Sequence, residues 1–268
     1  MNGKERMDRG ARHWTMTLLA VVLLGGFSPA QSITVAAAAD LQFAMQDIAT
    51  GFQKQAGKQV KVIYGSSGTF FQQIQNGAPF DMFFSANLDY PKQLESSGLT
   101  IPGSFYQYAK GKIVLWVPNE SKINIHSGLN SLLNPAVKKI AVANPQHAPY
   151  GQAAVAAMQS EGIYHKVKDK IVTGENISQT ASYVVSGAAD AGVIALSLAL
   201  SPNMKGKGRY FEIPAAEYPP INQACIILNS SKDKETANQF LSYLKTKAVA
   251  ETLQRYGFDV PINAQSTP

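Results

Sequence analysis

The feature that most constrains the fold of this chain is a regular alternation of short apolar runs with longer segments of helical periodicity. Runs at residues 33–37, 60–64 and 82–85 are rich in aliphatic and aromatic residues. Between the first two, Leu41, Met45, Ile48 and Phe52 recur at helical spacing. Strands that alternate with helices of this length form parallel βαβ units. We therefore expect an α/β protein in which helices cover mostly parallel sheets.

The alternation resumes after residue 113 and continues nearly to the C-terminal end. Further apolar runs lie at residues 113–117, 140–143, 171–172, 191–195 and 221–228, with helical patterns at 151–161, 178–186, 232–247 and 248–256. Two α/β groups in one chain favour two lobes, each with a mixed, mostly parallel sheet flanked by helices. Residues 113–117, which include Trp116, and residues 223–228 are the expected crossings between them.

These crossings divide the chain into a discontinuous first lobe and a continuous second lobe. The first lobe is expected to comprise residues 31–113 plus 223–268, and the second residues 114–222. Ligand sites in open α/β sheets form at the carboxyl ends of strands. The expected site is therefore a ligand cleft between the lobes, where two sets of strand ends face each other.

Residues 1–30 have the pattern of a secretory signal peptide. A segment with four basic residues precedes an apolar stretch over residues 14–27, and the small residues Ser28-Pro29-Ala30 follow. A membrane anchor is the alternative, but it requires about 20 apolar residues, and this stretch is interrupted by Gly25-Gly26. No cysteine near the cleavage site offers a place for a lipid. We expect a soluble, exported, periplasmic protein, cleaved near Ala30-Gln31.

Charge and cysteine content narrow the function classes further. The formal net charge is +6, and the leader holds four basic and two acidic residues, which leaves the mature chain at +4. This excess is spread along the chain, whereas nucleic-acid binding requires a concentrated basic footprint. Cys225 is the single cysteine, so the exported chain must be held by an ordinary core rather than by an internal disulfide.

Four loops follow an expected strand and open an expected helix. A helix start presents unpaired backbone N–H groups and the positive end of the helix dipole, which together favour anions. Serine, aspartate, glycine and proline are also ordinary cap and turn residues, so no single loop is specific. The loops are Ala38-Ala39-Asp40, Gly65-Ser66-Ser67-Gly68, Ala148-Pro149-Tyr150-Gly151 and Glu175-Asn176-Ile177-Ser178.

The motifs that would indicate an enzyme are missing from the sequence. The histidines have no metal-ligand spacing, and Cys225 lies in an apolar run typical of a core. Ser66-Ser67 lacks the nucleophile elbow of α/β hydrolases. Neither a phosphate loop nor a dinucleotide fingerprint occurs. An exported hydrolase of phosphate or sulfate esters stays an alternative of another class, since it would use similar anion loops, but no nucleophile set identifies it.

Several longer motifs resemble, in order along the whole mature chain, those of the periplasmic molybdate-binding proteins of ABC importers. They are Val35-Ala36-Ala37-Ala38-Ala39-Asp40-Leu41, Gly65-Ser66-Ser67-Gly68, Asn76-Gly77-Ala78-Pro79-Phe80-Asp81-Met82-Phe83-Phe84-Ser85-Ala86, Asn144-Pro145-Gln146-His147-Ala148-Pro149-Tyr150-Gly151, Ser186-Gly187-Ala188-Ala189-Asp190 and Arg255-Tyr256-Gly257-Phe258. The resemblance implies a type II periplasmic-binding fold, whose two lobes close by a hinge around one dehydrated tetrahedral oxyanion. It implies binding by neutral hydrogen-bond donors, without a cofactor, a cationic metal ligand or catalysis.

Carried over by motif position, the resemblance implies five ligand-binding residues: Ala39, Asp40, Ser67, Tyr150 and Ile177. Some relatives take the phenol from the position of Ala195, whereas this chain supplies it from Tyr150. A carboxylate facing a dianion would be repelled. We therefore expect Asp40 to offer only its backbone N–H while its side chain caps the following helix. Direct contact of this carboxylate with the metal centre is the alternative.

The resemblance also implies the ligand and the partners. The ligand is expected to be molybdate or tungstate, with sulfate, thiosulfate and phosphate as alternatives within the class of binding proteins. The partner is expected to be the membrane permease of the ABC importer. We also expect a monomer without nucleic-acid partners.

Overall fold

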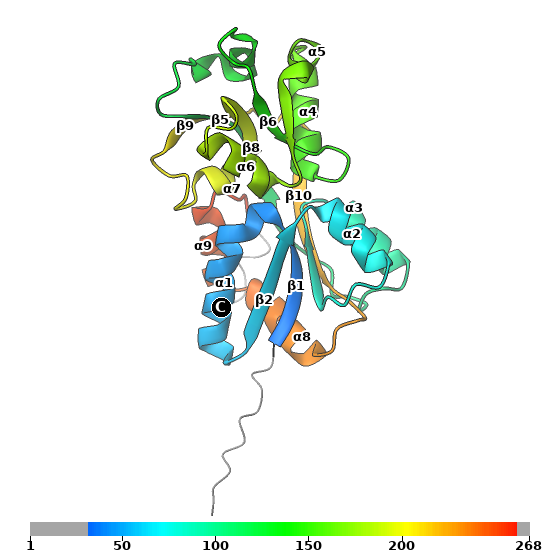
Figure 1. Cartoon of the computed structure of the whole chain (residues 1–268). Coiled ribbons are helices and arrows are strands. Elements are labelled where there is room, and N and C mark those ends of the chain that lie inside the picture. The colour runs from blue at the N-terminus through cyan, green and yellow to red at the C-terminus, as the bar shows by residue number, and fades with distance from the viewer. Residues whose placement is uncertain (1–31, 262–268) are drawn as a thin grey trace, which may run out of the picture.

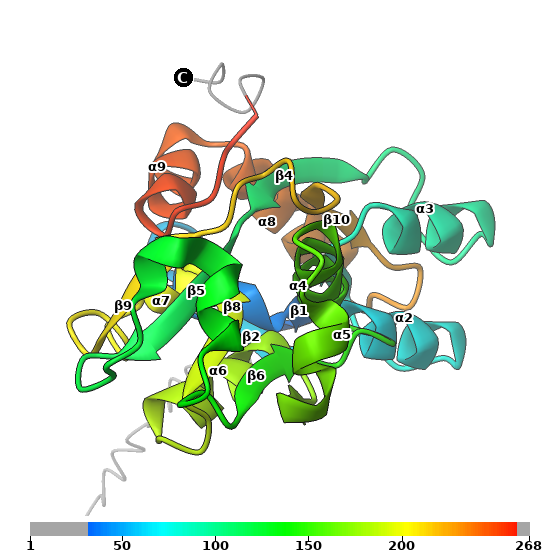
Figure 2. The same cartoon turned by 90° about the horizontal axis from the view of Figure 1, so that it is seen from above.

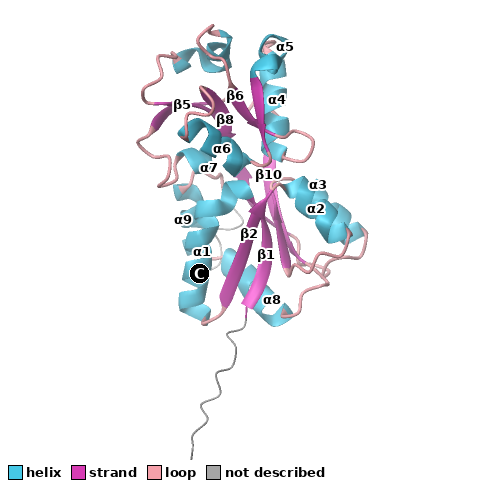
Figure 3. Ribbon diagram, in the orientation of Figure 1, coloured by secondary structure: helices cyan, strands magenta, loops and turns pink. Residues whose placement is uncertain are grey.

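The chain folds into two five-stranded mixed sheets stacked one beyond the other, each flanked by helices (Figures 1 and 3). The computed structural model describes residues 32–261; the expected signal peptide and its cleavage site lie outside the described residues. The expected α/β architecture with two lobes is confirmed. The sheets are not mostly parallel as expected, because each has two parallel and two antiparallel strand pairs. None of the helices within residues 32–261 has the length and apolar character needed to cross a membrane.

The first sheet combines the N-terminal βα units with one late strand. Its order is β2-β1-β3-β10-β4, with β1 parallel to β2 and β3, and β10 antiparallel to β3 and β4. The strands are β1 (Ser32–Ala38), β2 (Gln59–Gly65), β3 (Met82–Ser85), β4 (Tyr106–Gly111) and β10 (Ile221–Ile227). The helices are α1 (Gln42–Ala56), α2 (Ser67–Gln75), α3 (Asp89–Ser96), α8 (Lys234–Leu244) and α9 (Lys247–Arg255), preceded by the 3-10 turn η1 (Ala39–Leu41).

The second sheet repeats the same pattern with the middle of the chain. Its order is β7-β6-β8-β5-β9, with β6 parallel to β7 and β8, and β5 antiparallel to β8 and β9. The strands are β5 (Ile113–Pro118), β6 (Ile140–Ala143), β7 (Ile171–Gly174), β8 (Ala191–Ala195) and β9 (Gly208–Glu212). The helices are α4 (Pro149–Ser160), α5 (Tyr164–Val167), α6 (Ile177–Val185) and α7 (Leu196–Ala199), with the 3-10 segments η2 (Ile125–Leu133) and η3 (Lys168–Lys170).

Side-chain alternation along β3 explains why the first sheet is covered on both faces. Successive residues of a strand point to opposite faces. Met82 and Phe84 therefore pack into the cluster formed with α1, α8 and α9, whereas Phe83 packs with residues of α2 and α3. Figure 2 shows α8 and α9 on one side of β1, and α2 and α3 on the other. Two buried faces account for the continuous apolar run of this strand.

The links between the lobes differ from the expected ones. Residues 113–117 do not cross between the lobes, because they form most of β5 inside the second sheet, and β10 likewise lies inside the first sheet. The crossings are Lys112, between β4 and β5, and residues 213–220, between β9 and β10. Trp116 is consequently a core residue of the second lobe, 1% exposed, and not a residue of the link.

Candidate functional site

The expected site residues all lie where a strand ends and a helical segment begins, at the junction of the two lobes. In the first lobe, Ala39 and Asp40 lie in η1 after β1, and Ser67 is the first residue of α2. In the second lobe, Tyr150 is in the first turn of α4, and Ile177 is the first residue of α6. All five are at most 3% exposed. The sequence therefore places them on the elements that line the junction.

The lobes are in direct contact across this junction. Gly68 donates its N–H to the carbonyl oxygen of His147 at 2.9 Å, and the hydroxyl of Ser178 donates to Oε1 of Gln42 at 2.6 Å. A Cβ at Gly68 would lie 2.7 Å from the His147 carbonyl oxygen, closer than ordinary packing allows. Glycine at this position is what lets the start of α2 approach the opposite lobe, and the cleft is closed in this structure.

Asp40 is the centre of a buried hydrogen-bond cluster. Its Oδ2 accepts from the hydroxyl of Tyr150 at 2.8 Å and from Nε2 of Gln223 at 2.6 Å. The same Nε2 lies 2.9 Å from the Tyr150 oxygen, and the Tyr108 hydroxyl donates to Oε1 of Gln223 at 2.8 Å. Oδ1 of Asp40 is buried without a hydrogen-bond partner among the described residues. We call Asp40, Tyr108, Tyr150 and Gln223 the Asp40 cluster.

The expectation that the Asp40 side chain caps the following helix is wrong. Neither η1 nor α1 has a side-chain cap hydrogen bond. The carboxylate points instead to Tyr150 of the second lobe and to Gln223 of β10. A buried carboxylate gains more from these two donors than from an exposed cap, because burial leaves any unmade hydrogen bond uncompensated.

Burial sets the protonation of this cluster. Desolvation raises the pKa of Asp40 to about 6, against the opposing effect of hydrogen bonds from Gln223 and Tyr150. Desolvation also raises the pKa of both Tyr108 and Tyr150 well above the ordinary value, and the nearby Asp40 raises it further. The phenols therefore stay protonated, and Asp40 is the group of the cluster that titrates near neutral pH.

Gly111, at the end of β4, makes room for the Tyr150 phenol. A Cβ at this position would lie 2.0 Å from the Tyr150 hydroxyl oxygen and 2.9 Å from Nε2 of Gln223. Only a residue without a side chain leaves that space open. The hinge residue next to Lys112 thus takes part in positioning the cluster.

The other expected site residues offer neutral donors. Ser67 begins α2, and its Oγ accepts from the N–H of Ala86 at 2.9 Å. Asn176 caps α6 by accepting from the N–H groups of Ser178 and Gln179, a cap that does not use the N–H of Ile177. Within residues 32–261, no hydrogen bond from the N–H of Ser67 or of Ile177 is formed to another residue, and no lysine or arginine is bonded to Asp40, Ser67 or Tyr150..

Ser66 and His147 form a pair that superficially resembles a nucleophile and a base. Nδ1 of His147 lies 2.8 Å from Oγ of Ser66, and Nε2 lies 3.7 Å from Glu175. The serine hydroxyl donates its hydrogen to the carbonyl oxygen of His147, so this proton is already engaged by the backbone. The arrangement joins the two lobes at the edge of the cleft and does not present an activated nucleophile.

Several functional residues were missed at the level of sequence. Gln223 and Tyr108 are fully or almost fully buried, and Ser66 and His147 bridge the lobes. Gln223 did leave a signal, since it is an amide inside the apolar run 221–228. Buried polar groups need partners, so an amide in such a run predicts a polar cluster, although not its members.

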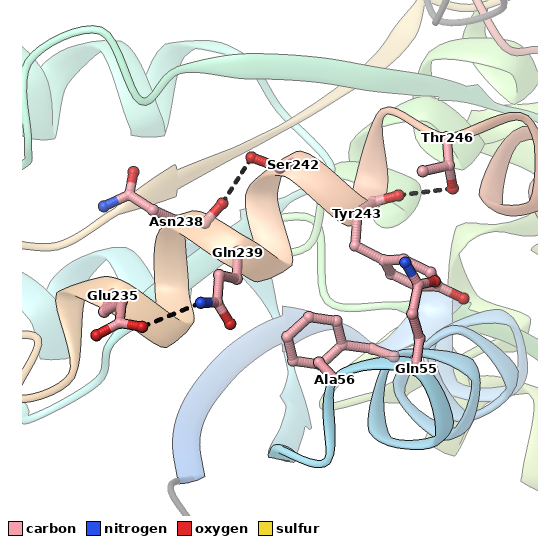
Figure 4. Close-up of a pocket in the computed structure, with 9 residues that line it drawn as sticks. Gln55, Ala56, Glu235, Asn238, Gln239, Ser242, Tyr243 and Thr246 are labelled. Atoms are coloured by element: carbon pink, nitrogen blue, oxygen red, sulfur yellow. Dashed lines mark hydrogen bonds between the residues drawn. The ribbon is translucent and has the colours of Figure 1, made fainter. Parts of the chain in front are cut away.

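A groove on the outside of the first lobe differs from the cleft between the lobes in the side chains that line it (Figure 4). It has a volume of about 640 Å³ and lies between α1 and α8, lined by residues that include Phe52, Glu235 and Tyr243. Asn238, Gln239 and Ser242 of α8 bond along their own helix, as in the bond from Gln239 to Glu235 at 3.1 Å. A carboxylate and an aromatic wall offer an anion no convergent donors.

Comparison with known proteins fits this geometry. Residues 33–259 match the model of the family described as bacterial extracellular solute-binding protein. The chain is 36% identical to the molybdate-binding protein ModA of Azotobacter vinelandii over 240 residues, which cover 90% of this chain and 94% of that protein. It is 33% identical to ModA of Rhodobacter capsulatus over 243 residues, with 90% and 94% covered.

The solved structures agree with the sequence relatives. The periplasmic molybdate-binding protein of Azotobacter vinelandii superposes with a TM-score of 0.81 at 34% identity, covering 85% of this chain and 99% of that chain. The names of these relatives describe them as molybdate-binding proteins. Because the family model matches residues 33–259, the chain belongs to the bacterial extracellular solute-binding proteins.

Proposed function

We propose that this chain is the extracytoplasmic solute-binding component of a molybdate and tungstate ABC importer. The observation that carries the proposal is the closed junction of two lobes, at which α2 and α6 begin with buried residues, Ser67 and Ile177, whose N–H groups donate to no other described residue. Helix starts favour anions. The names of the most similar relatives supply the identity of the oxyanion.

The proposed ligand contacts are Ala39, Asp40, Ser67, Tyr150 and Ile177. Hydrogen bonds to a charged acceptor contribute roughly 1.5–3 kcal/mol each. A few converging donors in a dry cleft therefore reach sub-micromolar affinity once the ordering cost is met. Cavity size then separates molybdate and tungstate, which are similar in size, from the smaller sulfate.

The proposed lobes are residues 31–113 plus 223–268, and residues 114–222, with bounds that lie within two residues of the starts of β5 at Ile113 and β10 at Ile221. The division is supported by the place of β4 and β10 in the first sheet and of β5 and β9 in the second. Closure of these lobes would present a ligand-dependent surface to the membrane permease of the importer. We further propose that the chain is exported to the periplasm, cleaved between Ala30 and Gln31, and acts as a monomer.

Isothermal titration calorimetry of the mature chain, residues 31–268, tests the proposed ligand. Molybdate and tungstate are expected to bind one per chain with sub-micromolar dissociation constants, and sulfate at least about 100-fold more weakly. Calorimetry is preferred to tryptophan fluorescence because Trp116 is buried in the core of the second lobe. Sulfate binding as tight as molybdate binding would contradict the proposal.

Phosphate is a second candidate ligand, and one observation favours it. Oδ1 of Asp40 is a buried acceptor without a partner among the described residues. Hydrogen phosphate carries a proton that such an acceptor can take, whereas sulfate does not at neutral pH. A competition titration with phosphate therefore belongs in the same experiment, and tighter binding of phosphate would replace molybdate as the ligand.

A further inference from the structure

The Asp40 cluster brings groups from both lobes onto one carboxyl. Asp40 follows β1, and Gln223 and Tyr108 come from β10 and β4 of the first sheet, whereas Tyr150 comes from α4 of the second lobe. The Ser197 hydroxyl on α7 also donates to the Asp40 carbonyl oxygen at 2.8 Å. The protonation state of the Asp40 carboxyl therefore affects the hydrogen bonds between the two lobes.

Counting hydrogens shows that the Tyr150 phenol has none to spare. The Tyr108 hydroxyl donates to Oε1 of Gln223, which orients the amide so that Nε2 faces Asp40 and Tyr150. Tyr150 receives from this amide and gives its single hydrogen to Oδ2 of Asp40. A phenol has one donor. While Asp40 is ionised and holds that hydrogen, Tyr150 cannot donate to a ligand.

Within residues 32–261, no lysine or arginine is bonded to Asp40, and Lys112, beside Gly111, is ion-paired with Glu212 and Asp259 instead. The two side-chain partners of Asp40, Tyr150 and Gln223, are neutral, and α6 and α7 contribute no charged residue. On α1, Asp47 lies five residues and Lys54 twelve residues beyond the first residue, Gln42. On β2, Lys61 pairs with Thr34, near the start of β1 and away from Asp40. Burial raises the pKa of five titratable side chains near the cluster, which are therefore neutral near pH 7: Tyr64, Tyr108, Tyr150, Tyr218 and Cys225. The other titratable groups of the junction, His147 and Glu175, lie 3.7 Å from each other at the edge of the cleft.

A dianion that enters this cleft would therefore meet an ionised carboxylate in a dry, uncompensated setting. Repulsion between the Asp40 carboxylate and a dianion at short range in a buried site disfavours the state in which both are ionised. Protonation of the carboxylate removes this repulsion. Oδ1 of Asp40 is the open position, since Oδ2 already accepts two hydrogen bonds. A carboxyl protonated at Oδ1 becomes a donor, which is what an oxyanion requires.

We propose that each oxyanion bound in this cleft is accompanied by one proton taken up from solvent and held on Oδ1 of Asp40. The proton removes the charge of Asp40, turns Oδ1 into a donor, and weakens the hold of Oδ2 on the Tyr150 hydrogen. Tyr150 is then released to donate to the ligand. This inference deepens the proposed function and rests on it.

Calorimetry at a fixed pH of about 7.5, in two buffers with different ionisation enthalpies, measures the proton count directly. Because Asp40 has a pKa of about 6 in the ligand-free protein, molybdate binding is expected to take up close to one proton. The dissociation constant is then expected to rise about tenfold per pH unit above about pH 7, and to level off below about pH 6. Molybdate itself stays a dianion over this range.

Two variants complete the test. Asp40→Asn, a neutral group that can still donate, is expected to bind molybdate without proton uptake and with a dissociation constant independent of pH. Asp89→Asn removes an exposed carboxylate at the start of α3, beside the cleft, and is expected to keep the proton uptake of the wild type. Thermal unfolding of both variants checks that they are folded.

The possible outcomes distinguish a failure of the proton coupling from a failure of the proposed function. Molybdate binding by the wild type without proton uptake would overturn the proton coupling and leave the molybdate function standing. Unchanged proton uptake in folded Asp40→Asn would also overturn it, since the proton would then reside elsewhere. Failure of molybdate to bind to wild type and to both folded variants, at any pH tested, would instead overturn the proposed function.

Discussion

Two buried aspartates of the first lobe are held in opposite ways. Asp81, at the start of β3 and 8% exposed, has both carboxylate oxygens satisfied: Oδ2 accepts from the N–H of Thr34 at 2.6 Å, and Oδ1 from Ser231 at 2.8 Å and the N–H of Lys232 at 3.0 Å. Asp40, 1% exposed beyond the end of β1, leaves Oδ1 without a partner among the described residues.

The difference separates a structural carboxylate from a functional one. Asp81 ties the strands and the loop before α8 together, and its hydrogen bonds are complete without any ligand. Asp40 lies at the carboxyl end of its strand, where α/β sheets bind ligands, and its hydrogen bonding is incomplete. An orphaned buried polar atom in a native protein calls for an explanation, and a ligand is one.

The largest effect is expected from Asp81→Ala. The change leaves the part-buried N–H groups of Thr34 and Lys232 and the buried hydroxyl of Ser231 without an acceptor, at about 1–3 kcal/mol for each unsatisfied group. We expect the free energy of unfolding to fall by about 4 kcal/mol in urea titrations. Molybdate affinity of the folded fraction should stay near that of the wild type. A loss below about 1 kcal/mol would show that Asp81 is not the structural member of the pair.

Asp40 is expected to act on stability through pH. Its pKa rises from 3.8 to about 6 on folding, so folding favours its protonated form. The stability from this group is fully present below about pH 4 and is lost as pH rises through about 6. At about 1.4 kcal/mol per unit of pKa, the loss is about 3 kcal/mol.

Urea titrations of the ligand-free protein at several pH values between about 4 and 7 measure this loss. In Asp40→Asn the corresponding fall should be absent, because no carboxyl titrates at this position. The difference between the two proteins isolates Asp40 from the other acidic groups. If both curves fell in parallel across this window, Asp40 would not be the titrating group.

Gly111→Ala disturbs the Asp40 cluster without changing the charge of any residue. The new Cβ would overlap the Tyr150 hydroxyl, at 2.0 Å from its oxygen, so the phenol must leave its place in the cluster. We expect molybdate affinity to fall about 30-fold, equivalent to about 2 kcal/mol. Calorimetry measures the loss. Its matched control is the same change in a Tyr150→Phe background, where the loss should be much smaller. An equal loss in both backgrounds would place the clash elsewhere.

The sequence predicted the central strands of the two sheets better than the edge strands. Strands buried on both faces, such as β6 and β8, appear as uninterrupted apolar runs, and their expected positions match the structure. β9 was missed because it is an edge strand with mostly exposed or half-buried residues, and β4 because it mixes tyrosine, glutamine and lysine. Edge strands carry a weak apolar signal, since one side of each is unpaired.

The sequence brought forward some residues of the junction as candidates, but it did not predict their contacts. Motif position singled out Asp40 and Tyr150, which the structure joins by a hydrogen bond. Their partner Gln223 lies 183 residues from Asp40 in sequence, and only the pairing of β10 with β3 and β4 brings it there. The side-chain direction of Asp40 was predicted wrongly for the same reason, because local propensity favours a cap and a long-range cluster overrides it.

The smallest effect is expected from Ser66→Ala, which alters the same junction away from Asp40. Its hydroxyl contacts both the carbonyl oxygen and Nδ1 of His147, but the parallel bond from Gly68 to that carbonyl remains. One neutral hydrogen bond of this kind contributes about 0.5–1 kcal/mol, so molybdate should bind about threefold more weakly and dissociate faster in stopped-flow competition. Ser96→Ala, whose hydroxyl bonds only within α3, is the control.

Proton uptake and the pH dependence of stability should both be unchanged in Ser66→Ala, because neither depends on this contact. A tenfold or greater loss of affinity would mean that closure depends on this edge of the cleft as much as on the Asp40 cluster.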